Sequence, residues 1–326
     1  FRSPAVVGRM DAVVDRLVEP LLGGVYAASA RRLSMAAAVP MLYAVARDGG
    51  SVTGAAAKAA AARSGTRSGS GAFIGLTGGV GRLPEHLRDV LVGRGVTVET
   101  GVTVRELTAT GSPRRPQWEA TCGPVPTPAY RSTDAVVLAV PPPAAARLLA
   151  PLAPVAGEIL GGIDMASMAI VTLAVERRGA DLPGSGFLVP DVDGRTIKAS
   201  TFSSGKWAWV DALDEDLVFL RASIGRAGDV TALQWPDADL VDVAVREVGE
   251  AVGAPLPRVV DSHVQRWGGG LPQYAVGHLG RIAQVEAAVA RVPGLEVCGA
   301  AYGGVGIPAV IASARAAAER LTRGSS

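Results

Sequence analysis

The sequence has 326 residues, and 48% of them are hydrophobic, so the chain can bury the cores of about two domains. Its formal net charge is +2 and no run of Lys or Arg exceeds two residues, which excludes a nucleic-acid-binding footprint and a polybasic membrane patch. The longest largely apolar run, residues 165–175, is shorter than the roughly 20 residues that span a bilayer.

The first part of the chain is expected to be helical. Apolar residues at three- and four-residue spacing predict an amphipathic helix over residues 4–22, which Gly23 and Gly24 would end. A second helical stretch, residues 34–47, should be interrupted at Pro40. Residues 49–72 are rich in Gly, Ser, Ala and Thr, a composition typical of a loop or linker.

From residue 75 onward, strands and helices alternate. A Gly-rich turn and a helix are predicted within residues 75–92, and the strand candidates after it are Val96–Thr100, Val102–Thr110, Trp118–Cys122 and Asp134–Val140. A later group predicts an antiparallel sheet with a two-residue hairpin turn at Asp193-Gly194; its members are Met165–Glu176, Gly186–Pro190, Arg195–Ser203 and Leu217–Arg226. Arg258–Trp267 is predicted as another strand. Further helices are expected over residues 237–252 and 278–292.

The last thirty residues have the pattern of half a dinucleotide site. A short apolar strand from Leu295 runs into a Gly-rich turn, and the turn leads into an Ala-rich helix. Such a turn gathers free backbone N–H groups and the positive end of a helix dipole, which together attract an anionic cofactor. The other half of such a site, a G-x-G-x-x-G turn after an N-terminal strand, is absent from the sequence.

Six short segments extend this pattern along the whole chain. They are RLVEPLLGGVY (16–26), TGGVGRLP (77–84), GFLVP (186–190), KASTFSSGKW (198–207), LPQYAVGH (271–278) and GAAYGGVGIP (299–308). Taken in this order, they resemble the flavin-dependent protoporphyrinogen/coproporphyrinogen oxidases of haem biosynthesis.

The resemblance implies an α/β plus α+β fold class: a discontinuous FAD-binding domain, an inserted antiparallel-sheet substrate domain and the tail of a helical domain. The expected division is residues 1–65 for the helical remainder, 66–160 and 277–326 for the two FAD-binding segments, and 161–276 for the substrate domain. The family's N-terminal βαβ unit would precede residue 1. We therefore expect an N-terminally truncated chain that holds FAD weakly by itself.

FAD is the cofactor that the resemblance implies. The N–H groups that open the last helix, those of Val305, Gly306 and Ile307, are the first candidates to face it. Val104, on a strand, would offer its backbone to the adenine of FAD, and Trp267 would contact the flavin ring. The full set of candidates is Val104, Trp267, Gly299, Ala300, Ala301, Val305, Gly306 and Ile307.

Basic residues of the predicted antiparallel sheet are candidates for the substrate. A porphyrinogen has propionate carboxylates, which basic side chains would bind. Lys198 and Arg221 are the candidates that we retain, and Arg195 and Lys206 lie in the same region. His86, His263 and His278 do not cluster at metal-ligand spacing, so no metal site and no catalytic acid or base is assigned.

The implied activity is oxidation of coproporphyrinogen III to coproporphyrin III, with oxygen as acceptor. An Arg- and Ala-rich composition, typical of a GC-rich actinobacterial genome, favours this substrate over protoporphyrinogen IX, which stays an alternative. Another enzyme of the flavin amine oxidase group, or an inactive fragment that binds no FAD, are further alternatives. The cysteines Cys122 and Cys298 lack a second cysteine at ligand or redox spacing, so we expect buried thiols and a cytoplasmic protein.

Overall fold

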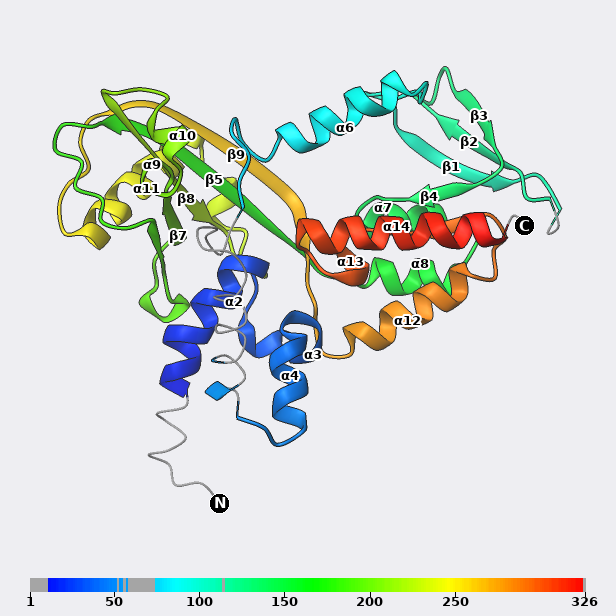
Figure 1. Cartoon of the computed structure of the whole chain (residues 1–326), viewed down its shortest axis with the longest axis horizontal. Coiled ribbons are helices and arrows are strands. Elements are labelled where there is room, and N and C mark those ends of the chain that lie inside the picture. Colours follow the sequence, from blue (N-terminus) through cyan, green and yellow to red (C-terminus); the bar gives the residue numbers. More distant parts are fainter. Residues whose placement is uncertain (1–10, 52, 55–56, 58–73, 113–114, 325–326) are drawn as a thin grey trace. The chain divides into compact units, whose positions relative to one another are not determined.

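The computed structural model describes residues 11–324 except 52, 55–56, 58–73 and 113–114 (Figure 1). The chain divides into two compact units, each built from separated segments. Unit 1 comprises Phe1–Leu33 and Asp164–Gln273, and unit 2 comprises Ser34–Ile163 and Tyr274–Ser326. Among the described residues, no helix combines the length and the apolar character needed to cross a membrane.

Unit 1 is built on a five-stranded antiparallel sheet in the order β6-β7-β8-β5-β9. All five predicted strands are present, as β5 (Met165–Glu176), β6 (Gly186–Leu188), β7 (Ile197–Phe202), β8 (Leu217–Ile224) and β9 (Val259–Pro272). The predicted two-residue hairpin turn is wrong. A 3₁₀ turn, Asp191–Asp193, and the left-handed Gly194 lie inside a longer connection between β6 and β7.

One face of this sheet is covered by α11 (Asp237–Val252), which begins and ends where the sequence predicts. Alternate residues of β5, among them Val171 and Leu173, are fully buried against Leu240 and Val248 of this helix in one hydrophobic core. The residues between them, such as Thr172, therefore lie on the opposite side of the sheet. We call that second side the open face.

The N-terminal helix departs from its prediction. A π-helical turn (Val14–Val18) leads into α2 (Glu19–Tyr26), which continues through the two glycines expected to end it. A Cβ atom at Gly24 would lie 3.2 Å from Leu188 Cδ2 of β6, so this glycine allows close packing of helix on strand. The helix ends at Ala27, which is left-handed with φ 51°. The first part of the predicted helix, residues 4–10, lies outside the described residues.

Unit 2 contains two small sheets. The first is antiparallel in the order β1-β2-β3, with β1 at Val104–Ala109, β2 at Trp118–Cys122 and β3 at Ala129–Thr133; the second pairs β4 (Val136–Leu138) with β10 (Leu295–Val297) in parallel. The predicted strand at residues 96–100 is wrong, and β3 was not predicted.

Helices make up most of the rest of unit 2 (Figure 1). They are α3 (Met35–Ala38), α4 (Pro40–Arg47), α6 (Arg82–Gly93), α7 (Pro142–Leu149), α8 (Pro154–Gly161), α12 (His278–Val289), α13 (Ala300–Gly303) and α14 (Ile307–Gly324). The expected interruption before Pro40 is confirmed, because α3 ends and α4 begins there. Most of the predicted linker, residues 58–72, lies outside the described residues.

Candidate functional site

Two parallel strands of unit 2 end side by side, and each leads into a helix. The last residue of β10, Val297, pairs with Leu138 of β4, and the Cys298 N–H donates to the Leu138 carbonyl over 3.1 Å. The chain continues from β4 into α7 and from β10 into α13 and α14. In α/β sheets, ligands bind beyond the carboxyl ends of such strands, so a cofactor is expected at this edge.

The turn after β10 has a backbone that only glycine adopts readily. Gly299 has φ 128° and ψ −169°, and Gly304 has φ 131° and ψ 150°. Both lie in a region that is essentially closed to residues with a side chain. A Cβ atom at Gly299 would find no heavy atom within 4 Å, so the space beside this residue is open. The Gly299 N–H donates to Ser313 Oγ of α14 over 3.2 Å, which ties the start of the turn to the last helix.

The N-terminal end of α14 presents the N–H groups that the sequence singled out. Ile307 is the first residue of this 18-residue helix, and Val305 and Gly306 come just before it. The first intrahelical bond runs from the Val310 N–H to the Gly306 carbonyl. Among the described residues nothing accepts a hydrogen bond from the N–H groups of Val305, Gly306 and Ile307. An open glycine turn and free N–H groups at a helix start fit an anionic phosphate-bearing cofactor such as FAD.

Val104 lies at the start of β1 and is 37% exposed. Its carbonyl accepts a hydrogen bond from Arg147 Nη2 of α7 over 3.1 Å, and the Arg105 carbonyl accepts one from Nη1. Arg147 thus links β1 to the helix that follows β4. Sequence reasoning missed this arginine, because a long side chain that reaches backbone carbonyls some forty residues earlier leaves no local pattern.

Trp267 lies in unit 1 on β9. It is 54% exposed and pairs across the sheet with Met168 of β5. Because the neighbouring buried residues of β5 face α11, this pair lies on the open face.

Arg221 occupies the middle of the open face. It pairs with Thr201 of β7 on one side and Thr172 of β5 on the other, and Thr172 pairs in turn with His263 of β9. Facing residues in such rows have their Cβ atoms about 5 Å apart. Arg221 is exposed, and among the described residues no carboxylate pairs with it. A free guanidinium between two hydroxyl-bearing residues is suited to bind a carboxylate.

Lys198 is not the exposed cation that its position on a sheet suggests. It occupies the β-bulge between Ile197 and Ala199, it is only 4% exposed, and its buried ammonium lacks a hydrogen-bond partner among the described residues. Burial first, and the nearby charge of Arg226 second, lower its pKa to about 8. The other two basic residues of this region are engaged, since Arg195 pairs with Glu250 and Lys206 lies over the Trp207 ring at 5.7 Å.

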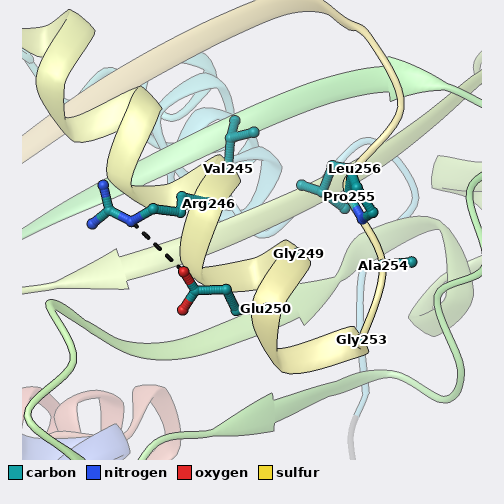
Figure 2. A pocket seen from close by; sticks show the side chains of 8 residues that line it. All are labelled: Val245, Arg246, Gly249, Glu250, Gly253, Ala254, Pro255 and Leu256. Carbon is teal, nitrogen blue, oxygen red and sulfur yellow. Dashed lines mark ion pairs between the residues drawn. The ribbon is translucent and has the colours of Figure 1, made fainter.

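The described surface also has a pocket of about 550 Å³ at the C-terminal end of α11. Figure 2 shows its lining, in which Arg246 and Glu250 form an ion pair over 3.9 Å and Pro255 and Leu256 come from the loop after the helix. Because α11 covers the buried side of the sheet, this pocket does not involve Arg221 or Trp267.

The family model described as flavin containing amine oxidoreductase matches residues 7–322. The chain belongs to this family. The predicted recognition of a flavin-dependent oxidoreductase is thereby confirmed, and the mixed helices and antiparallel sheets are those of a flavin amine oxidase-type fold.

Several relatives of this chain have the same description. This chain is 35% identical over 316 residues to the "Coproporphyrinogen III oxidase" of Mycobacterium leprae (strain TN), and the match covers 95% of this chain and 64% of the relative. The Bacillus subtilis (strain 168) protein of the same name is 29% identical, with 94% and 64% covered. A crystal structure from Exiguobacterium sp. 255-15, provisionally described as a protoporphyrinogen oxidase, superposes with a TM-score of 0.79 at 28% identity, covering 95% and 64%. The chain therefore spans less than two thirds of the length of these relatives.

Proposed function

We propose that this flavin oxidoreductase oxidises a porphyrinogen, with coproporphyrinogen III as substrate and oxygen as electron acceptor. The observation that supports this most strongly is the 35% identity, over 95% of the chain, to a mycobacterial protein named for that substrate. Protoporphyrinogen IX is the second candidate, because a Nicotiana tabacum chloroplast protein named for it is 25% identical over 298 residues. The two free, buried cysteines suit the cytoplasmic location that we propose with this role.

In this proposal unit 2 supplies the C-terminal and middle segments of a discontinuous FAD-binding domain. The 299–307 turn would hold the cofactor through Gly299, Ala300, Ala301, Val305, Gly306 and Ile307, and Val104 would contribute its backbone to the adenosine part. A bound flavin supplies the oxidising power by accepting hydride equivalents. The chain's own task is to fix the position of that cofactor and to exclude water from it.

Unit 1 would present the substrate. Its open face combines apolar side chains, such as Ile170 and Trp267, with the guanidinium of Arg221 between Thr172 and Thr201. A macrocycle with carboxylates at its rim would lie against the apolar part while Arg221 binds a propionate. Lys198, which the sequence also suggests, is enclosed and would act on the substrate only if the chain around it moved.

Turnover of three candidate substrates tests the proposal directly. The chain is supplied with excess FAD and, in separate reactions, with coproporphyrinogen III, protoporphyrinogen IX or cyclohexylamine, and porphyrin fluorescence and peroxide are followed. We expect porphyrin to form fastest from coproporphyrinogen III. Peroxide formed only with the amine would contradict the proposal, and faster turnover of protoporphyrinogen IX would replace the first substrate by the second.

The Arg221→Met variant tests the proposed carboxylate anchor. Loss of a charge-assisted hydrogen bond costs about 1.5–3 kcal/mol, so we expect KM for coproporphyrinogen III to rise at least about tenfold while kcat changes little. Arg178→Met is the matched control, because Arg178 is an exposed arginine of the same unit that lies outside the sheet. Equal KM values for the two variants would show that Arg221 does not bind the substrate.

A further inference from the structure

Two stacked aromatic rings pack against the Gly-rich turn of unit 2. Tyr274 and His278 are 2% and 1% exposed, and their ring centroids are 4.2 Å apart with an interplanar angle of 17°. The four-residue spacing and the left-handed Gly277 between them bring the two rings together at the start of α12. Neither residue was assigned to the cofactor from the sequence, where the segment only contributed to the resemblance.

Each ring is hydrogen-bonded to the turn helix α13. The Tyr274 hydroxyl donates to the Ala300 carbonyl, and His278 Nε2 lies 2.8 Å from the Ala301 carbonyl oxygen. A carbonyl can only accept, so Nε2 must carry the proton. His278 Nδ1 is buried without a partner among the described residues, and burial lowers the pKa of the ring. His278 is therefore a neutral donor in the Nε2–H tautomer, and it is unsuited to act as a base from this position.

These two bonds fix the direction of the turn's peptide groups. A peptide unit is planar, so holding the Ala300 carbonyl also sets the direction of the Ala301 N–H. The next peptide is held at both ends, because the Ala301 carbonyl accepts from His278 while the Tyr302 N–H donates to the Gly299 carbonyl over 3.1 Å. On the other side of the turn, Ser313 holds the Gly299 N–H. The carbonyls thus point toward α12.

We propose that Tyr274 and His278 are positioning residues for the flavin, which hold the 299–306 turn so that the open N–H groups at its end, those of Val305, Gly306 and Ile307, face the cofactor. This inference assumes the flavin-binding role of the turn given under Proposed function. The two rings contact the turn on the side of its carbonyl groups, which faces α12, and they do not themselves contact the cofactor. Their loss would loosen the turn and weaken cofactor binding without removing any cofactor contact.

Three variants test the proposal. Tyr274→Phe removes only the hydroxyl, His278→Leu removes the donor, and His278→Gln keeps an N–H donor at a similar reach. Hydrogen exchange of the amides in residues 299–306 and equilibrium titration with FAD are measured on the full chain. We expect the Phe and Leu variants to exchange these amides about tenfold faster and to bind FAD about tenfold more weakly, and the Gln variant to keep both values near those of the parent chain.

The control is His86→Leu, which makes the same change on α6, where the residue is exposed. If His278→Leu fails to fold, Tyr274→Phe still decides, because it removes a single oxygen atom. Unchanged exchange in the Phe variant would overturn the proposal. Faster exchange with unchanged FAD affinity would overturn its flavin part. If the parent chain takes up no FAD, the proposed cofactor site fails, whereas the exchange rates still decide whether the rings hold the turn.

The neutral state of His278 predicts a pH signature. Its pKa in the folded chain lies below the ordinary 6.5, chiefly through burial and further through Arg281. Below pH 6.5 the unfolded chain therefore binds more protons, and stability falls as the pH drops toward the folded pKa. Ionisable residues on the described elements packed against α12 or bonded to His278 include Glu158 of α8, Glu296 of β10 and Tyr302 of α13. We expect His278→Gln to flatten this loss of stability on the acid side, as measured by urea denaturation between about pH 5 and 7.

Discussion

The Lys198→Met variant is expected to unfold with a free energy about 3 kcal/mol larger than that of the parent chain at pH 7. The ammonium of Lys198 is enclosed and lacks a partner among the described residues, and its pKa falls from the ordinary 10.5 to about 8. Because a tenfold change in proton affinity corresponds to about 1.4 kcal/mol, keeping the charge in the folded chain costs about 3 kcal/mol at pH 7. Methionine fills a similar volume without that charge.

The same shift predicts how stability depends on pH. Between pH 8 and 10.5 the unfolded chain binds the lysine proton more tightly than the folded chain, so stability of the parent rises with pH over this window and is flat below it. In the Lys198→Met variant this rise should disappear. Urea denaturation followed by tryptophan fluorescence measures it, because all tryptophans except Trp118 lie in unit 1.

Lys206→Met is the matched control, since Lys206 is an exposed lysine of the same unit. It should leave both the stability at pH 7 and the slope between pH 8 and 10.5 almost unchanged. A Lys198→Met variant that is less stable than the parent would mean that the ammonium has solvent or an anion beside it. Because the ammonium is enclosed, we also expect Lys198→Met to leave KM for the porphyrinogen unchanged, in contrast to Arg221→Met.

Lys198 also illustrates what the sequence does not specify. Its side of the sheet depends on a one-residue bulge in β7, and the charge that further lowers its pKa belongs to Arg226, which comes later in the chain. Neither feature leaves a local pattern. By contrast α11 was predicted to the residue, because its apolar residues recur at helical spacing, although the side buried against the sheet is formed by Leu240, Val243, Ala244 and Val248.

The same distinction applies in unit 2. The strand β3 was missed because four of its five residues are exposed, so it lacks the alternation that marks a half-buried strand. The Gly-rich turn was located because glycines between a strand and a helix have a known local effect. Its supporting contacts, from Tyr274, His278 and Ser313, are tertiary and became visible only in the fold.

Gly299→Ala is expected to reduce the affinity for FAD about a hundredfold, which corresponds to about 2.7 kcal/mol. At φ 128° and ψ −169° a residue with a Cβ atom is strained by about 1–3 kcal/mol. The turn must either keep this conformation under strain or relax, and relaxation would redirect the N–H groups that follow. In addition, the new methyl group would enter the open space beside Gly299, where the backbone would otherwise approach the cofactor.

Gly303→Ala is the matched control for this prediction. A Cβ atom there would meet the Ala309 carbonyl oxygen and Ser313 Cβ at 3.9 Å each, which is ordinary contact, and its φ is not positive. Gly304 would be a poorer choice, because its Cβ would lie 3.0 Å from Ala309 Cβ and so mix a packing clash with the backbone effect. FAD affinity is measured by titration and the fold by urea denaturation. If Gly299→Ala loses stability but keeps its FAD affinity, the turn has only a structural role and other residues bind the cofactor. Strain in these peptide groups would also weaken FAD binding if the same groups formed the cofactor site.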